Sequence, residues 1–131
     1  MYVSTPAKSL NINDTKEIVH LAQQKNGAHS ITGFLCCNSK YFIQCLEGDR
    51  DSIERLFEII SEDTRHTNIV MLDHHACDHR VFSNWSMGVV LEMDKHHDIL
   101  HRYTNKNLFD PYKMSSDECL NLLVDFSQLK Q

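Results

Sequence analysis

Gln44 is the first side chain whose chemistry stands out, because it is a polar amide within an apolar, strand-forming stretch. Successive residues of a strand point to opposite faces, so Phe42, Gln44 and Leu46 share one face. A buried glutamine needs partners for both its carbonyl oxygen and its NH2 group. From the residues alone, we favour a satisfied core amide over a functional group at this position.

A second candidate for chemistry is a polar connection that gathers metal-binding side-chain types: His74, His75, Cys77 and His79. Imidazole and thiolate could hold Zn²⁺ there, but the spacing matches no zinc motif, so a solvated loop is the favoured interpretation. A cysteine–histidine nucleophile can be imagined from Cys36 or Cys45. Both fall in predicted strands, where a buried cysteine behaves as an inert hydrophobe. The sequence therefore favours a protein that is not an enzyme.

The composition describes one globular domain. The chain has 131 residues, of which 41% are hydrophobic and 24% are charged. Its formal net charge of −5 argues against a nucleic-acid partner, which a basic face would attract. No apolar run is long enough to cross a bilayer and no leader pattern opens the chain, so we expect no membrane association. Five cysteines without framework spacing indicate reduced thiols and a cytoplasmic location.

Periodicity and capping residues predict the elements that must position these side chains. Residues 1–4 are apolar enough for a strand end, and because only Met1 precedes Tyr2 we expect this first strand to be nearly absent. A helix is predicted over residues 14–25, with Asp14 and Glu17 as its capping box. Further strands are predicted at 30–37, 41–46, 68–74 and 86–93, a second helix begins at Asp51 and Glu54, and a tail helix begins at Ser115 and Glu118.

The predicted order is β-α-β-β-α-β-β followed by a helical tail. The fold class is therefore α+β: a ferredoxin-like βαββαββ sheet with two helices on one face and a C-terminal helical extension. We expect the tail to pack on the far face of the sheet. Two helices on one face leave a slot that could take a flat ligand. Glu47, Glu54 and Glu58 are expected to be solvated charges beside or on the second helix.

Four motifs occur in order along the chain: NGAHSITG at 26–33, FIQCLEG at 42–48, DTRH at 63–66 and FSNWSMG at 82–88. Together they resemble the signature series of BLUF domains, which are blue-light sensors that use FAD. The resemblance covers residues 2–93. The tail, with MSSDEC at 114–119, resembles the C-terminal helices of short stand-alone cyanobacterial-type BLUF proteins. We therefore expect a BLUF flavin-binding domain over 1–93 and a helical extension over 94–131 packed on the same domain.

The resemblance implies roles for individual residues around the flavin. Tyr2 matches the tyrosine that donates an electron and a proton to the excited flavin, and Gln44 matches the glutamine that bridges that phenol and the flavin. Asn26 matches the asparagine that hydrogen-bonds the flavin carbonyl and N3 region. Ile18 and Ile60 would then sandwich the ring from the two helices.

Further residues follow from the same resemblance. Trp85 and Met87 match a pair on the last strand whose positions relative to the glutamine relay the signal. Asp63, Arg65 and His66 are candidates for contacts with outer parts of FAD.

The implied function is a blue-light receptor, without catalytic turnover, that binds FAD. Light would rearrange the hydrogen bonds among tyrosine, glutamine and flavin. The signal would pass to a separate response-regulator-like protein or change the homo-oligomeric state, because the chain leaves no room for an output module. The alternative is a ferredoxin-like protein-binding module that is not photoactive and has lost flavin.

Overall fold

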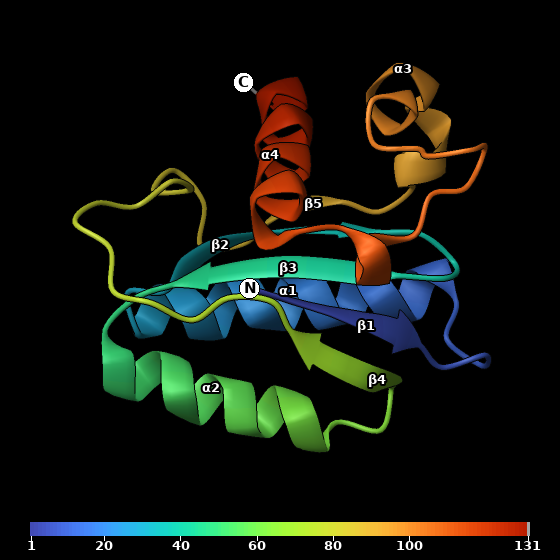
Figure 1. The fold of residues 1–131 in the computed structure, drawn as a ribbon. Coiled ribbons are helices and arrows are strands. Elements are labelled where there is room, and N and C mark those ends of the chain that lie inside the picture. The colour runs from blue at the N-terminus through green and yellow to red at the C-terminus, as the bar shows by residue number, and fades with distance from the viewer. Residues whose placement is uncertain (131) are drawn as a thin grey trace.

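A computed structural model describes residues 1–130 as one five-stranded sheet in the order β4-β1-β3-β2-β5, with helices on both faces (Figure 1). The strands are β1 Tyr2–Pro6, β2 Thr32–Cys37, β3 Phe42–Glu47, β4 His66–Met71 and β5 Gly88–Val90. The α-helices are α1 Ile12–Ala28, α2 Arg50–Glu62, α3 His97–His101 and α4 Ser116–Ser127, and short 3₁₀ turns cover Met93–Lys95, Pro111–Lys113 and Gln128–Lys130.

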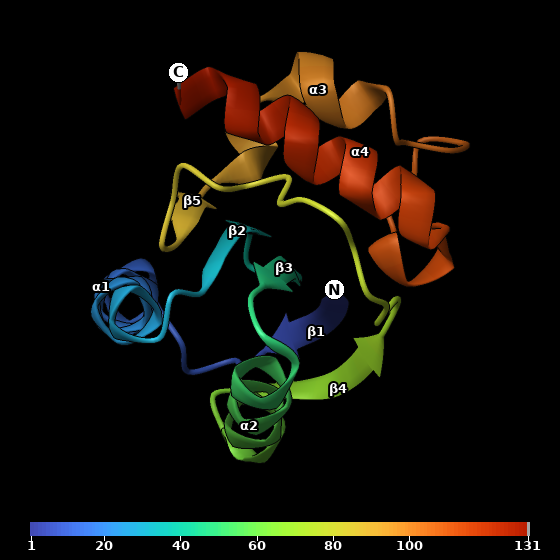
Figure 2. The same ribbon diagram turned by 90° about the vertical axis from the view of Figure 1, so that its left-hand side faces the viewer.

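The layers match the predicted fold class. Figure 2 shows α1 and α2 on one face of the sheet and α3 and α4 on the other. All strand pairs are antiparallel except β2 with β5, which run parallel. The α+β, ferredoxin-like arrangement with a C-terminal helical extension is therefore confirmed, and the tail packs on the far face as expected.

The first strand is the clearest correction. It was expected to be nearly absent, yet β1 has five residues and pairs with β3 on one side and β4 on the other. Pro6 is the last strand residue, where the missing N–H does least harm to the ladder. A register shift between Val3 and Thr5 bends the β4 pairing. Tyr2 therefore lies on a central strand directly opposite Gln44.

The helix starts show where local capping signals suffice. Ser115 and Glu118 form the predicted capping box of α4. The predicted start of α1 was late, because Asn11 is the N-cap and Asp14 is the third helical residue of its capping box. The start of α2 shifts likewise, since Asp49 rather than Asp51 accepts the capping hydrogen bond from the Ser52 N–H. Several acidic or amide residues precede each helix, and only one can take the extended N-cap conformation.

The last strand is much shorter than predicted. Residues 86–93 were expected to form it, but β5 covers three residues and pairs only with β2. The Ser86 and Met87 carbonyls accept hydrogen bonds from side chains of α1, and Met93 turns inward in a 3₁₀ turn. Tertiary contacts thus replace sheet pairing at both ends of this segment.

The core under α4 is made of buried apolar side chains. Phe34, Ile43, Leu122, Leu123 and Phe126 are fully buried there. The helix has its apolar positions at helical spacing, so one face of α4 covers β2, β3 and β5. This layer holds the sheet that positions the polar side chains on the opposite face.

Candidate functional site

The centre of the site is a cross-strand pair on the face covered by α1 and α2. Tyr2 and Gln44 are opposite each other in the β1–β3 register, and both side chains are buried. The Tyr2 hydroxyl donates a hydrogen bond to Gln44 Oε1. Burial, and to a smaller extent the Asp63 carboxylate, raises the pKa of the Tyr2 phenol. Tyr2 therefore stays neutral and keeps the proton that it donates.

The other end of the Gln44 amide contacts the last strand segment. Gln44 Nε2 donates to Met87 Sδ at 3.3 Å, and Met87 is 2% exposed. A phenol, an amide and a thioether thus form one buried chain from β1 through β3 to the residue before β5. Both ends of the amide have partners, as the chemistry of a buried glutamine requires.

Trp85 lies apart from this chain. Its ring packs edge-to-face on Phe34, with ring centroids 5.6 Å apart, and belongs to the core under α4. The structure therefore brings Met87 to Gln44 and places Trp85 with the side chains of the opposite sheet face. Trp85 and Met87 are two positions apart in the sequence, yet their side chains pack on opposite faces of the sheet.

His66 is buried behind Tyr2 rather than at the rim of a cleft. Its Nε2 donates to the Ile60 carbonyl at 2.7 Å, because a carbonyl can only accept. In the neutral ring Nδ1 is then the acceptor, and Ser4 Oγ donates to it at 2.7 Å. Both ring nitrogens are occupied by protein atoms, so His66 supports the wall around Tyr2.

Two amides of α1 hold the segment that leads into β5. Asn26 Nδ2 donates to the Ser86 carbonyl and Gln23 Nε2 donates to the Met87 carbonyl, both at 2.9 Å. They are three residues apart, so they lie on one face of the helix. Asn26 is 2% exposed. Within residues 1–130 no protein donor reaches Asn26 Oδ1, which leaves an acceptor for another group.

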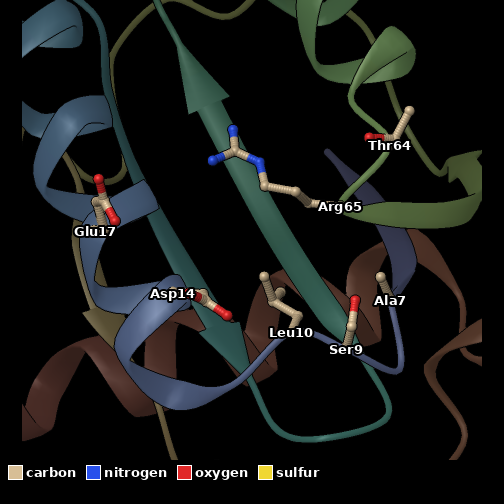
Figure 3. A pocket seen from close by; sticks show the side chains of 7 residues that line it. All are labelled: Ala7, Ser9, Leu10, Asp14, Glu17, Thr64 and Arg65. Carbon is tan, nitrogen blue, oxygen red and sulfur yellow. The ribbon is translucent and has the colours of Figure 1, made fainter.

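A pocket of about 330 Å³ opens between the start of α1 and the connection from α2 to β4 (Figure 3). Arg65 reaches into it, and three hydrogen bonds of 2.5–3.0 Å tie the guanidinium to the Asp63 carboxylate. The guanidinium holds the pKa of Asp63 below its usual value. The pocket is lined by Ala7, Ser9, Leu10, Asp14, Glu17, Thr64 and Arg65.

The second helix has an apolar stripe that the protein buries only in part. Its residues Ile53, Leu56, Phe57 and Ile60 recur at helical spacing, yet no residue of α2 is buried. On α1, Ile18 is likewise only half-buried. Helices normally bury such stripes against the core. The two predicted sandwich residues, Ile18 and Ile60, thus keep apolar surface that a flat ligand between the helices would cover.

Glu47 corrects one expectation of the sequence. It was expected to be a solvated charge, but it is 8% exposed and accepts from the backbone N–H groups of Val81 at 2.6 Å and Phe82 at 2.8 Å. Thr32 Oγ1 also donates to it. Glu47 therefore ties the end of β3 to the loop that carries Trp85. The role of Gln23 was not predicted either. Neither Gln23 nor Glu47 has sequence neighbours that indicate a backbone partner on a distant loop.

The other candidates for chemistry form no site. His74, His75, Cys77 and His79 are exposed, and across residues 1–130 no three metal-binding side chains gather. Cys36 is buried and Cys45 is partly exposed, and burial raises the pKa of both thiols, which disfavours the thiolate form that a nucleophile needs. In the described part of the chain, no helix combines the length and the apolar character needed to cross a bilayer.

The fold is that of a small α+β domain with a buried tyrosine–glutamine–methionine chain on one face of its sheet. The family model for BLUF, described as sensors of blue light using FAD, matches residues 1–88. The chain belongs to this family, a family of flavin-based blue-light sensors.

Curated relatives share this domain. The chain is 32% identical over 89 residues to photoactivated adenylate cyclase subunit alpha from Euglena gracilis, covering 66% of this chain and 9% of that protein. It is 30% identical over 99 residues to the blue light- and temperature-regulated antirepressor BluF from Escherichia coli K12, covering 72% and 24% respectively. The chain thus spans about a tenth of the length of the first of these relatives.

Solved structures extend the likeness to the tail. BlsA in its photo-activated state superposes with a TM-score of 0.83 at 29% identity, covering 95% of this chain and 89% of that one. The dark-state structure of BlrB, a BLUF protein, superposes with a TM-score of 0.81 at 25% identity, covering 99% and 93%. The similarity therefore includes the C-terminal helices as well as the sheet.

Proposed function

We propose that this chain is a blue-light receptor that binds FAD non-covalently between α1 and α2 and signals through Tyr2, Gln44 and Met87. The observation that carries the proposal is the buried hydrogen-bond chain of these three residues, beneath α1 and an α2 whose apolar stripe is only half-buried. FAD bound there supplies the light absorption and the redox chemistry. The protein would bind and orient the cofactor and change its own hydrogen bonds in response to light.

The residues present fit a flavin. Ile18 and Ile60 would cover its two faces, and Asn26 Oδ1 has the free acceptor position that a flavin N3–H needs. Arg65, which lines the pocket, and Asp63, to which it is hydrogen-bonded, would contact outer parts of the cofactor. His66 would act through Ser4 and Ile60, since its ring nitrogens already have partners.

Tyr2 and Gln44 would carry the primary response. The neutral phenol of Tyr2 is an electron and proton donor, and its proton points at Gln44 Oε1. If the Gln44 amide turns or tautomerises, its donor and acceptor ends exchange places. A methionine sulfur is only an acceptor, so a carbonyl oxygen turned toward Met87 would lose the present contact. The state of the amide would thereby be passed to Met87.

We propose that the output is a contact with a separate protein, of response-regulator-like character, or a change in homo-oligomeric state. Support comes from the name of the E. coli relative, which is an antirepressor regulated by blue light. Trp85, on the opposite sheet face from Gln44, would convey the change toward the layer of α4.

An absorption spectrum before and after blue light tests the proposal. We expect a yellow protein whose flavin bands shift to longer wavelength in the light and return in the dark. Gln44→Leu keeps the side-chain volume but removes both amide ends, so it should bind flavin and show no shift. A colourless protein that also refuses added FAD would instead support a binding module without flavin.

A further inference from the structure

We propose that Gln23 is a positioning residue for the light response: it holds the Met87 backbone to α1 and so keeps the Met87 sulfur within reach of Gln44. This inference rests on the proposed function and adds a residue to it. The juxtaposition that carries it is the double attachment of one methionine. Gln44 Nε2 contacts its sulfur at 3.3 Å, and Gln23 Nε2 donates to its carbonyl at 2.9 Å.

Met87 lies between two backbone contacts with β2: the Gly33 N–H donates to the Trp85 carbonyl at 3.1 Å, and the β5 pairing begins at Gly88. The first β5 residue paired with β2 is Gly88, opposite Phe34, so Met87 precedes the ladder. Upstream, Glu47 fixes the N–H groups of Val81 and Phe82. The stretch between these two anchors contains both Trp85 and Met87. On the face proposed to bind flavin, side chains of α1 hold the backbone of this stretch. Gln23 is the one that donates to the Met87 carbonyl itself.

The geometry makes the two attachments of Met87 act together. A thioether sulfur is a weak acceptor on a flexible side chain, so its contact with Gln44 depends on where the backbone is held. The Gln23 hydrogen bond, to a backbone carbonyl, is the more rigid of the two. Without the Gln23 hydrogen bond, the Met87 backbone can move away from α1. The Met87 sulfur would then no longer be held next to Gln44, and a turn of the Gln44 amide would no longer move it.

The chain offers a matched control. Gln24 has the same side chain one position along and is exposed, and its side-chain hydrogen bond within residues 1–130 is to His20 on its own helix, at 3.4 Å. Gln23→Leu and Gln24→Leu therefore remove the same amide from the same helix. Gln23→Glu is the sharper variant, because it keeps the shape and loses the N–H donor.

The experiment follows two signals in the flavin-loaded protein. The flavin absorption shift reports the Tyr2–Gln44 response, and the fluorescence of Trp85, the single tryptophan of the chain, reports the segment. We expect Gln23→Leu and Gln23→Glu to keep the absorption shift, while the light-induced change in Trp85 fluorescence falls to less than about half of the wild-type change. Gln24→Leu should retain both signals.

The outcomes separate the two proposals. If the wild-type protein shows no absorption shift, the proposed function fails. If the wild type shows both signals and the Gln23 variants retain both in full, the positioning role is wrong. Loss of flavin from the Gln23 variants, with Gln24→Leu still loaded, would also overturn it, because Gln23 would then act in binding the cofactor.

Discussion

Beneath α4 the sheet buries mainly apolar side chains, whereas beneath α1 and α2 it buries Tyr2, Ser4, Gln44 and His66 beside a smaller apolar cluster. The α4 face has phenylalanines and leucines with no exposed surface, while α2 has no buried residue at all. Burial of apolar surface is the main source of stability, and buried polar groups mostly break even. The comparison teaches that one face stabilises the fold and the other keeps space and hydrogen-bonding groups for a ligand.

The largest expected effect comes from opening a cavity under α4. Phe126 is fully buried, so Phe126→Ala should lower the free energy of unfolding by about 3–5 kcal/mol. Denaturant unfolding measures this change. Leu129→Ala is the control at the end of the same helical tail, where the side chain is 48% exposed, and it should change little. Equal losses for both would mean that α4 does not anchor the sheet.

Alkaline pH should destabilise both faces, since each buries a thiol. Burial raises the pKa of Cys37, under α1, to about 12 and that of Cys119, under α4, to about 11, from an ordinary value of 9.0. Above pH 9.0 the unfolded thiols ionise while the folded ones keep their protons. The free energy of unfolding should therefore fall with rising pH, by up to about 1.4 kcal/mol per pH unit for each thiol.

Unfolding midpoints in reducing buffer between pH 8 and pH 11 check this slope. Cys37→Ala and Cys119→Ala should each flatten it, and the Cys119 contribution should end at the lower pH. A stability that stays constant over this range in the wild type would contradict the burial of these thiols.

Glu47 ties the end of β3 to the loop that carries Trp85, and its removal should have an intermediate effect. Glu47→Ala leaves the Val81 and Phe82 N–H groups without their acceptor, which should cost about 1–3 kcal/mol. Glu54→Ala removes only an exposed pair with Arg50, for which we expect less than about 0.5 kcal/mol. Unfolding in urea compares the two variants, and the order of their losses is the critical result.

Substitutions on α2 should have the smallest effect on stability. Two neighbouring isoleucines there should nevertheless differ clearly in their effect on flavin binding. Ile60 is half-buried and Ile59 is 67% exposed, so either alanine variant should lower the free energy of unfolding of the flavin-free protein by about 1 kcal/mol or less. Only Ile60→Ala should release flavin, measured as the cofactor retained after gel filtration. Equal retention by both variants would remove Ile60 from the flavin site.

Features that depend on neighbours in the sequence could be predicted. The capping box of α4 and the alternation that puts Phe42 and Gln44 on one face needed only residues a few positions apart. The family resemblance predicted roles for Tyr2, Asn26, Gln44 and Met87, and the structure places Gln44 between Tyr2 and Met87. By contrast, the strength of β1 came from two partner strands that lie far along the chain.

Gln23 and Glu47 could not be predicted because their partners are distant backbone atoms. Gln23 is 64 residues from Met87, and Glu47 is 34 residues from Val81. A backbone carbonyl or N–H is the same at every position, so no residue type at the partner position reveals such a contact. Their side chains alone indicate only ordinary surface residues.

By itself, the amino-acid sequence determined the element order, the polar side chain on β3 and the family to which the chain belongs, because these depend on local periodicity and on residue types at fixed spacing. Only the tertiary structure decided that Met87 lies with Gln44 while Trp85 lies with Phe34 on the opposite face. The tertiary structure also decided that side chains of α1 and β3 hold the segment that leads into β5. The physical reason is that long-range packing decides where a short strand ends, and the residues before it are held by distant groups: the Ser86 and Met87 carbonyls by side chains of α1 and the Trp85 carbonyl by the Gly33 N–H of β2.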